Sequence, residues 1–288
     1  MKISKGITMA AIVKVALLST LLIGHAHAAQ CPLIPAGIPA TEIFQASKLL
    51  QDGKFSEVDA ILVKLHKNNL TSEGGDLLTS RHIDALVNLS EEKEELLRRW
   101  FDEQPQSFFS QLSAGIFFVI QASKARGTKF ASETSQEQFK KMAEINLVAM
   151  DYLQKAMLLD ASSALPHSII LGIAARQNFA AQKTPTQWLF AALQTDPNSL
   201  AARVNAMTYF SPRWGGSFEF LEQIVLQSEK SLSAQSVHYL RYNIVMEKAI
   251  HEEVVTKNKP QANELYKQAL GMCENSTLAR EGIERTSK

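Results

Sequence analysis

The stretch TPTQWLFAALQTDPNS, residues 184–199, holds one complete helix between a start signal and a stop signal. Thr184 suits the N-cap, Pro185 suits the first helical position, and Gln187 stands where a capping box requires it. The Asp-Pro pair that follows ends this helix and starts the next one. The stretch therefore predicts a helix, a short turn and a second helix, which is a helical hairpin.

The end of this helix recurs elsewhere in the chain. Ala192 precedes the Asp-Pro turn, Ala156 occupies a similar context 36 residues earlier, and Ala269 follows 77 residues later. A small residue before such a turn resembles the end of the second helix of a tetratricopeptide repeat, where alanine allows close helix packing. Only the copy at Ala192 has the proline, and the usual Trp-Leu-Gly-Tyr signature of the first helix is missing. We interpret the chain as repeat-like.

Helix signals dominate the rest of the chain, because apolar residues recur at intervals of three and four and seldom alternate. The helix that follows Gln104-Pro105-Gln106-Ser107 and runs to Arg126 is apolar almost all round, so it should be the most buried. We expect an all-α protein of about twelve helices in antiparallel pairs, arranged as a tetratricopeptide-like solenoid or a closed crescent. The expected helices are 41–51, 56–68, 76–89, 91–102, 107–126, 136–159, 165–179, 185–195, 199–209, 218–230, 233–255, 260–272 and 277–285.

The first 28 residues have the features of a secretory signal peptide. Lys2 and Lys5 precede an apolar run, and Ala26-His27-Ala28 is a small-x-small cleavage pattern. An uncleaved N-terminal anchor is the alternative, although Lys14 interrupts the run and leaves it short for a membrane span of about 20 residues. We predict a signal peptide at 1–28, an extended segment at 29–40 and a helical domain at 41–288, with a periplasmic or secreted location.

The charge of the mature chain predicts no attraction to nucleic acid or to an anionic membrane surface. Removing three signal-peptide lysines from 30 basic residues leaves 27 against 29 acidic ones, a net charge of about −2. No cofactor motif is present. His251-Glu252 begins like a zinc-protease helix, but Val255 stands where the second histidine is needed, so we expect no metal site.

Two cysteines, Cys31 and Cys273, remain after removal of the signal peptide. An exported chain enters an oxidising compartment, so an even number of cysteines favours a disulfide. Two buried, unpaired thiols are the alternative.

Several motifs in a fixed order resemble a bacterial family of unknown function. The resemblance covers about residues 45–230 and implies a helical, tetratricopeptide-like architecture and no particular activity. Its most specific part is the Pro-(Lys/Arg)-Trp-Gly-Gly-Ser loop. The stretches that carry it are 50–58, 100–107, 121–127, 158–160, 193–197 and 209–217.

The loop Ser211–Ser217 contains the strongest candidate binding residues. We expect Trp214 to be buried between helices, with its N–H bonded to a partner, and Ser217 to cap the next helix. The alternative is that Arg213 and Trp214 contact a ligand or partner. Arg126 has two interpretations as well, a favourable charge at a helix C-terminus or an anion or carboxylate clamp.

No catalytic constellation is present, and repeat arrays present grooves that bind peptides or helices. We therefore expect an exported protein–protein interaction module, such as a scaffold, an adaptor or an immunity-type inhibitor of another envelope protein, with no enzymatic activity. A cell-envelope enzyme, such as a cell-wall hydrolase, is the alternative. No membrane-spanning segment is expected after cleavage.

Overall fold

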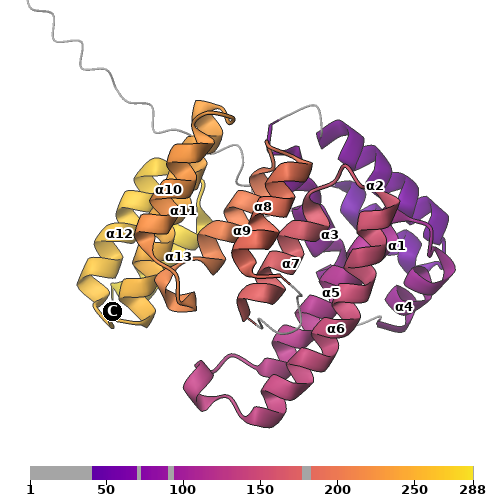
Figure 1. The fold of residues 1–288 in the computed structure, drawn as a ribbon, viewed down its shortest axis with the longest axis horizontal. Coiled ribbons are helices and arrows are strands. Elements are labelled where there is room, and N and C mark those ends of the chain that lie inside the picture. The colour runs from indigo at the N-terminus through magenta and orange to yellow at the C-terminus, as the bar shows by residue number, and fades with distance from the viewer. Residues whose placement is uncertain (1–40, 70–72, 90–93, 177–182, 288) are drawn as a thin grey trace, which may run out of the picture.

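The computed structural model describes residues 41–69, 73–89, 94–176 and 183–287 of the 288-residue chain. These ranges form thirteen α-helices and two short 3-10 helices, and they contain no strand (Figure 1). None of these helices combines the length and apolar character needed to cross a bilayer. The elements are α1 (Thr41–Gln51), α2 (Phe55–Asn69), α3 (Gly75–Leu89), α4 (Glu94–Glu103), α5 (Phe108–Arg126), η2 (Ala131–Glu133), α6 (Gln136–Leu159), α7 (Leu165–Arg176), α8 (Pro185–Thr195), α9 (Leu200–Tyr209), η3 (Pro212–Trp214), α10 (Phe218–Ser228), α11 (Ala234–Val254), α12 (Lys259–Met272) and α13 (Thr277–Thr286).

The all-α prediction is confirmed for the described residues, and the positions of the helices agree with the sequence pattern. Two expected helices, 91–102 and 165–179, extend into ranges that lie outside the described residues. The signal peptide, the extended segment and Cys31 lie outside them too. Between α5 and α6, where the sequence predicts no helix, the chain forms the short 3-10 turn η2.

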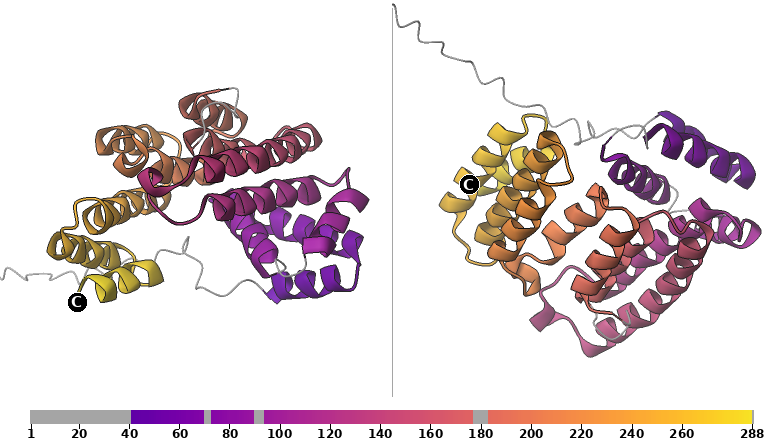
Figure 2. Two further views of the ribbon diagram at one scale, coloured as in Figure 1. Left: turned by 90° about the horizontal axis from the view of Figure 1, so that it is seen from below. Right: turned by 45° about the horizontal axis from the view of Figure 1, so that its top comes forward.

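Neighbouring helices pack as pairs, with α5 against α6, α7 against α8 and α11 against α12. The first helices and the last ones lie at opposite ends of the molecule (Figure 1). Seen from below, both ends lie on the same side of the central helices, so the array is curved (Figure 2).

Helix α5 forms the centre of the apolar core, as its sequence predicts. Every residue from Phe109 to Phe118 is buried. Gly115 lets α6 approach closely, since a Cβ at this position would lie 2.5 Å from the side chain of Leu153. Trp100 and Phe101 of α4 are also fully buried beside this helix. The core therefore joins α4, α5 and α6 into one block.

The three alanines singled out in the sequence occupy equivalent positions in the structure. Ala156, Ala192 and Ala269 are fully buried in the last turns of α6, α8 and α12. Each carbonyl accepts the N–H of the C-cap residue four positions later. The three C-cap residues have nearly the same φ and ψ, namely −139° and 93°, −137° and 101°, and −140° and 85°. The repeated sequence thus produces a repeated helix ending.

A repeated serine follows each of these helix endings. Ser163, Ser199 and Ser276 stand seven residues after the respective alanines, and each side chain accepts a backbone N–H of the next helix, at 3.3, 3.1 and 3.0 Å. Satisfying these N–H groups fixes where the next helix starts. The unit that repeats is a helix–turn–helix with a buried alanine and a serine cap.

Contacts between distant parts of the chain produce the curvature. Asp76, at the start of α3, accepts hydrogen bonds from the Ser199 hydroxyl at 2.6 Å and from the Ala201 N–H at 3.1 Å, at the start of α9. A carboxylate is favourable at this helix N-terminus. Further along α3, Arg81 donates to the Tyr239 hydroxyl of α11 at 2.5 Å. The array therefore bends back so that α3 contacts both α9 and α11.

A half-buried carboxyl group connects α2 to α4. Asp59 accepts a hydrogen bond from the indole N–H of Trp100 at 3.1 Å. Burial raises the pKa of Asp59 to about 6, from a usual value of 3.8. The folded state binds this proton more tightly than the unfolded state, so it loses stability as the pH rises from about 4 through about 6.

We predict that Asp59→Asn removes this pH-dependent loss of stability, because asparagine does not ionise. Its side-chain oxygen can still accept the hydrogen bond from the Trp100 indole. The variant's stability relative to the parent should increase between pH 4 and pH 7 in urea unfolding experiments. Burial also raises the pKa of Asp84 to about 6. Asp84 is present in both proteins, so its contribution to the pH dependence cancels in the comparison. A stability difference that stays constant across this pH range would contradict the prediction.

Candidate functional site

Three arginines that are far apart in the sequence meet at one cavity of about 350 Å³. Arg126 ends α5, Arg176 ends α7, and Arg213 belongs to η3. The tip of the α5–α6 hairpin, which supplies one wall, projects from the rest of the fold (Figure 1). The lining residues are Ser123, Arg126, Gly127, Ala131, Phe139, Met142, Ala175, Arg176, Arg213 and Trp214. We call this cavity the arginine pocket.

Arg213 is held at the pocket by a buried carboxylate. Its Nε and Nη2 donate to the two carboxylate oxygens of Glu247 on α11, at 2.8 and 2.9 Å. The Glu247 side chain is only 8% exposed, so this two-bond ion pair supplies the counter-charge that burial requires. The η3 turn is therefore attached to α11.

The glycines of the loop make this turn possible. Gly215 has a φ of 87°, in the left-handed region that favours glycine. Gly216 passes so close to the carbonyl of Phe210 that a Cβ would collide with the backbone. Ser217 then accepts the N–H of Phe220 at 3.1 Å and caps α10, as the sequence predicts.

Arg126 is fixed by the loop that follows α5. Its Nη1 donates to the carbonyls of Gly127 at 3.2 Å and Lys129 at 2.6 Å. Gly127 has a φ of 80°, which explains the glycine at this helix end. Gln138, from the start of α6, donates to the Arg126 carbonyl at 3.1 Å. Both ends of the hairpin loop thus hold this arginine in place.

Arg176 is the pocket residue that the sequence analysis missed. Its Nε donates to the Gly172 carbonyl at 3.0 Å, and its Nη1 donates to the Ser123 hydroxyl of α5 at 2.8 Å. The guanidinium lies over the Tyr209 ring, 5.6 Å from the centroid. The sequence contains a pattern that could have identified Arg176, because α7 ends in Ala-Arg as α5 does.

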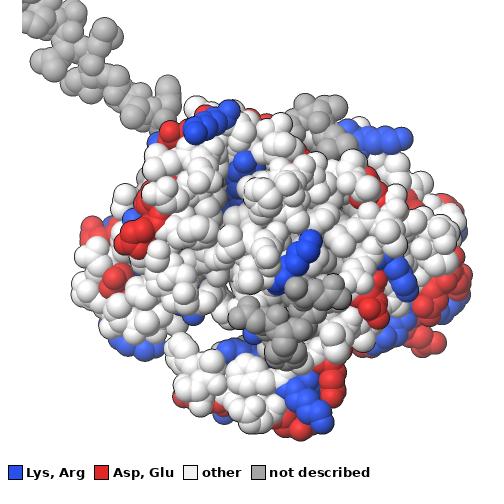
Figure 3. Space-filling model, in the orientation of Figure 1, with Lys and Arg blue, Asp and Glu red and all other residues white. Residues whose placement is uncertain are grey.

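The pocket combines unpaired positive charge with apolar surface. Within the described ranges, neither Arg126 nor Arg176 forms an ion pair, whereas Arg213 is paired with Glu247. Phe139, Met142 and Trp214 supply apolar walls. Over the face drawn in Figure 3, acidic and basic side chains are scattered and much of the centre is uncharged. The arrangement can bind an anionic group that is attached to an apolar one.

The expectation that Trp214 is buried between helices is wrong. Its side chain is 36% exposed, because the η3 turn holds it at the mouth of the pocket. One side of the ring faces Tyr209, with ring centroids 6.0 Å apart. Among the described residues its indole N–H has no hydrogen-bond acceptor. Trp214 therefore presents an exposed edge at the pocket that Arg126 and Arg213 also line.

The family of the protein follows from a comparison with known families. The model of a family described as a domain of unknown function (DUF4034) matches residues 42–174 and 149–245, which together span more than half of the chain. The chain belongs to this family. Its matched region includes the whole lining of the arginine pocket. Comparison with curated proteins and with solved structures finds no match.

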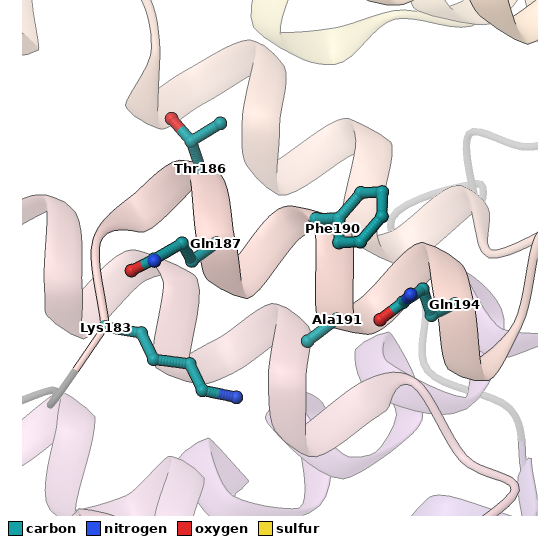
Figure 4. A pocket seen from close by; sticks show the side chains of 6 residues that line it. All are labelled: Lys183, Thr186, Gln187, Phe190, Ala191 and Gln194. Carbon is teal, nitrogen blue, oxygen red and sulfur yellow. The ribbon is translucent and has the colours of Figure 1, made fainter.

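A second hollow, of about 440 Å³, lies on the outer face of α8 in this DUF4034 protein (Figure 4). Its described walls come from α8 and from Lys183, which lies just before that helix. The Lys183 ammonium lies 4.8 Å from the Trp188 ring centroid, and Phe190 is 63% exposed. The side chains that line it are Lys183, Thr186, Gln187, Phe190, Ala191 and Gln194. Lys183 is the one cationic side chain among its described lining residues, whereas three arginines line the arginine pocket. The arginine pocket is therefore the stronger candidate binding site.

The described part of this family member holds no group of three histidine, cysteine, aspartate or glutamate side chains that could bind a metal ion. In the arginine pocket the Ser123 hydroxyl donates to the Val119 carbonyl at 2.9 Å and accepts from Arg176. Among the described residues, this hydroxyl therefore contacts a carbonyl and a guanidinium group and no base that would activate it.

Two tryptophan variants distinguish a pocket residue from a core residue. Trp100→Ala should cost about 3–5 kcal/mol of unfolding free energy, because it removes a fully buried ring and its hydrogen bond. Trp214→Ala should cost less than about 2 kcal/mol, since the ring is partly exposed. Urea unfolding followed by circular dichroism measures both values. Equal losses would show that Trp214 is a packing residue after all.

Proposed function

We propose that this protein is an exported interaction module that binds another protein of the cell envelope through the arginine pocket. The observation that carries the proposal is the convergence of Arg126, Arg176 and Arg213 on one cavity, with only Arg213 paired to a carboxylate among the described residues. Arginine is well suited to a protein interface, because its planar fork binds carboxylates through two parallel hydrogen bonds. The exposed edge of Trp214 adds an aromatic contact.

We propose that the helices form a tetratricopeptide-like array that is curled into a crescent, with the Pro-Arg-Trp-Gly-Gly-Ser loop as a mark of the family. The three equivalent helix endings at Ala156, Ala192 and Ala269 support the array. The hydrogen bonds of Asp76 and Arg81 to later helices support the curl. In a straight solenoid each unit would contact only its neighbours.

We favour binding over the envelope-enzyme alternative because of the chemistry of the pocket lining. A glycoside hydrolase uses a pair of carboxyl groups at the scissile bond. Among the described residues, the side chains that line the arginine pocket include no carboxylate, imidazole or thiol. What they offer is positive charge and apolar surface, which suits recognition.

The pocket proposal is tested by neutralising the two unpaired arginines. We expect Arg126→Gln combined with Arg176→Gln to weaken capture of an envelope partner at least about tenfold, since each charged hydrogen bond contributes about 1.5–3 kcal/mol. Quantitative mass spectrometry after affinity purification from an envelope fraction measures the loss.

The matched control is Arg241→Gln, which removes an exposed arginine that pairs with Glu229 outside the pocket. This variant should capture the partner as the parent does. Thermal melting confirms that all variants are folded. Undiminished capture by the double variant would reject the pocket as the binding site.

Export is tested by the mass of the mature chain. Cleavage after Ala28 predicts an intact mass that corresponds to a chain starting at or near Ala29, recovered from the periplasm or the medium. A full-length chain retained in the membrane would favour the anchor alternative.

We propose that Cys273 forms a disulfide with Cys31. Cys273 is fully buried at the C-cap of α12. Closing a span of this length should restrict the unfolded chain by about 5 kcal/mol on the loop-entropy estimate. Thiol titration of the unfolded, unreduced mature protein should find no thiol in the parent and one in Cys273→Ser. Two thiols in the parent would rule out the bridge.

A further inference from the structure

Each of the three guanidinium groups of the arginine pocket is held through one or two of its nitrogens, and its other nitrogens make no hydrogen bond among the described residues. Among the described residues, no hydrogen bond uses Nε or Nη2 of Arg126, Nη2 of Arg176 or Nη1 of Arg213. The nitrogens in use donate to carbonyl, hydroxyl and carboxylate oxygens. The arginines are therefore oriented before any ligand arrives, which lowers the entropic cost of binding.

The apolar lining restricts the kind of anion that fits. Half of the ten described residues around the cavity are apolar, namely Ala131, Phe139, Met142, Ala175 and Trp214. A small inorganic anion such as phosphate would contact the arginines and leave this apolar surface in water. A carboxylate that carries an apolar side chain would satisfy the arginines and cover the apolar wall.

The size of the cavity restricts the ligand further. At about 350 Å³ it lies near the lower end of the range for ligand pockets, which is about 300–1,000 Å³. Such a volume accommodates the end of a peptide and is too small for a helix or a strand that passes through. At the end of a polypeptide, a carboxylate and a side chain stand on the same Cα atom.

From this geometry we infer that the arginine pocket recognises the C-terminal carboxylate of a polypeptide whose last residue is apolar. Arg126 and Arg176 bind the carboxylate, and the last side chain lies against Phe139, Met142 and Trp214. The inference rests on the proposed function and names the part of the partner that enters the pocket. A free apolar monocarboxylate has the same chemistry, so the test separates the two sources.

The protein contains an internal reporter for this test. Of its three tryptophans, Trp100 is fully buried and Trp188 is 5% exposed, whereas Trp214 is 36% exposed. Acrylamide quenching of tryptophan fluorescence therefore reports mainly on Trp214. A ligand in the pocket should protect Trp214 from the quencher, and Trp214→Phe should abolish the signal.

The probes are an N-acetylated tripeptide ending in leucine with a free carboxylate, the same peptide as its amide, hexanoate, and inorganic phosphate. We expect saturable protection by the free-acid peptide. The amide and phosphate should bind at least about tenfold more weakly, and so should the free acid with Arg126→Gln or Arg176→Gln. Hexanoate should bind more weakly than the peptide, and Arg241→Gln should change nothing.

Equal binding of the acid and the amide, tighter binding of phosphate, or no binding of the acid would overturn the inference. If hexanoate binds as tightly as the peptide, the ligand of the pocket is a small apolar acid and not the C-terminus of a polypeptide. If these probes fail while the double arginine variant still loses its envelope partner, the inference falls and the proposed function remains.

Discussion

A buried negative charge at Glu247 decides how the functional part of this protein is arranged. A carboxylate that is taken out of water needs a counter-charge with good geometry, and Arg213 provides it through two parallel hydrogen bonds. Because Arg213 lies in η3, the ion pair attaches this turn to α11. The position of Trp214 follows directly, since it is the next residue of a turn that its glycines allow to bend sharply. The wall of the pocket is thus a consequence of charge compensation inside the fold.

The repeated helix endings provide the frame around this pair. A fully buried alanine in the last turn lets the next helix approach, and a serine seven residues later caps that helix. The ending at Ala156 leads into α7 and determines where its last residue, Arg176, is placed. Small side chains at helix ends therefore set the spacing that brings the arginines of α5 and α7 together.

Local features of the fold could be predicted from the sequence, because their causes are local. The capping box of Thr184, the cap at Ser217 and the burial of α5 depend on residues within a few turns of each other. The burial of Trp214 was predicted wrongly. Proline and glycine indicate a turn, but the exposure of the ring depends on Glu247, which is 33 residues away in the sequence. Arg176 was missed because a helix-terminal arginine has the same local pattern whether it faces solvent or a pocket.

The choice between a solenoid and a closed crescent lay beyond sequence reasoning for the same reason. Asp76 looks like an ordinary first-turn carboxylate of α3, yet it accepts hydrogen bonds from the start of α9. Burial raises the pKa of this carboxyl, and the bonds from Ser199 and Ala201 oppose that increase. Nothing in the sequence around Asp76 indicates which helix it will meet. Contacts of this kind are tertiary, and they decide whether an array of hairpins is straight or curled.

Arg126 and Arg176 stand without carboxylate partners in the described structure, and the helices themselves explain how this is tolerated. Both residues end a helix, where the unsatisfied carbonyls carry partial negative charge and favour a cation by about 0.3–1 kcal/mol. Each guanidinium also donates to carbonyl or hydroxyl oxygens, which satisfy part of its hydrogen-bonding capacity without neutralising it. A second carboxylate, placed beside them as Glu247 is beside Arg213, would stabilise the fold and occupy the pocket. The fold instead stabilises two positive charges with dipoles, and so keeps them available for an anion from outside.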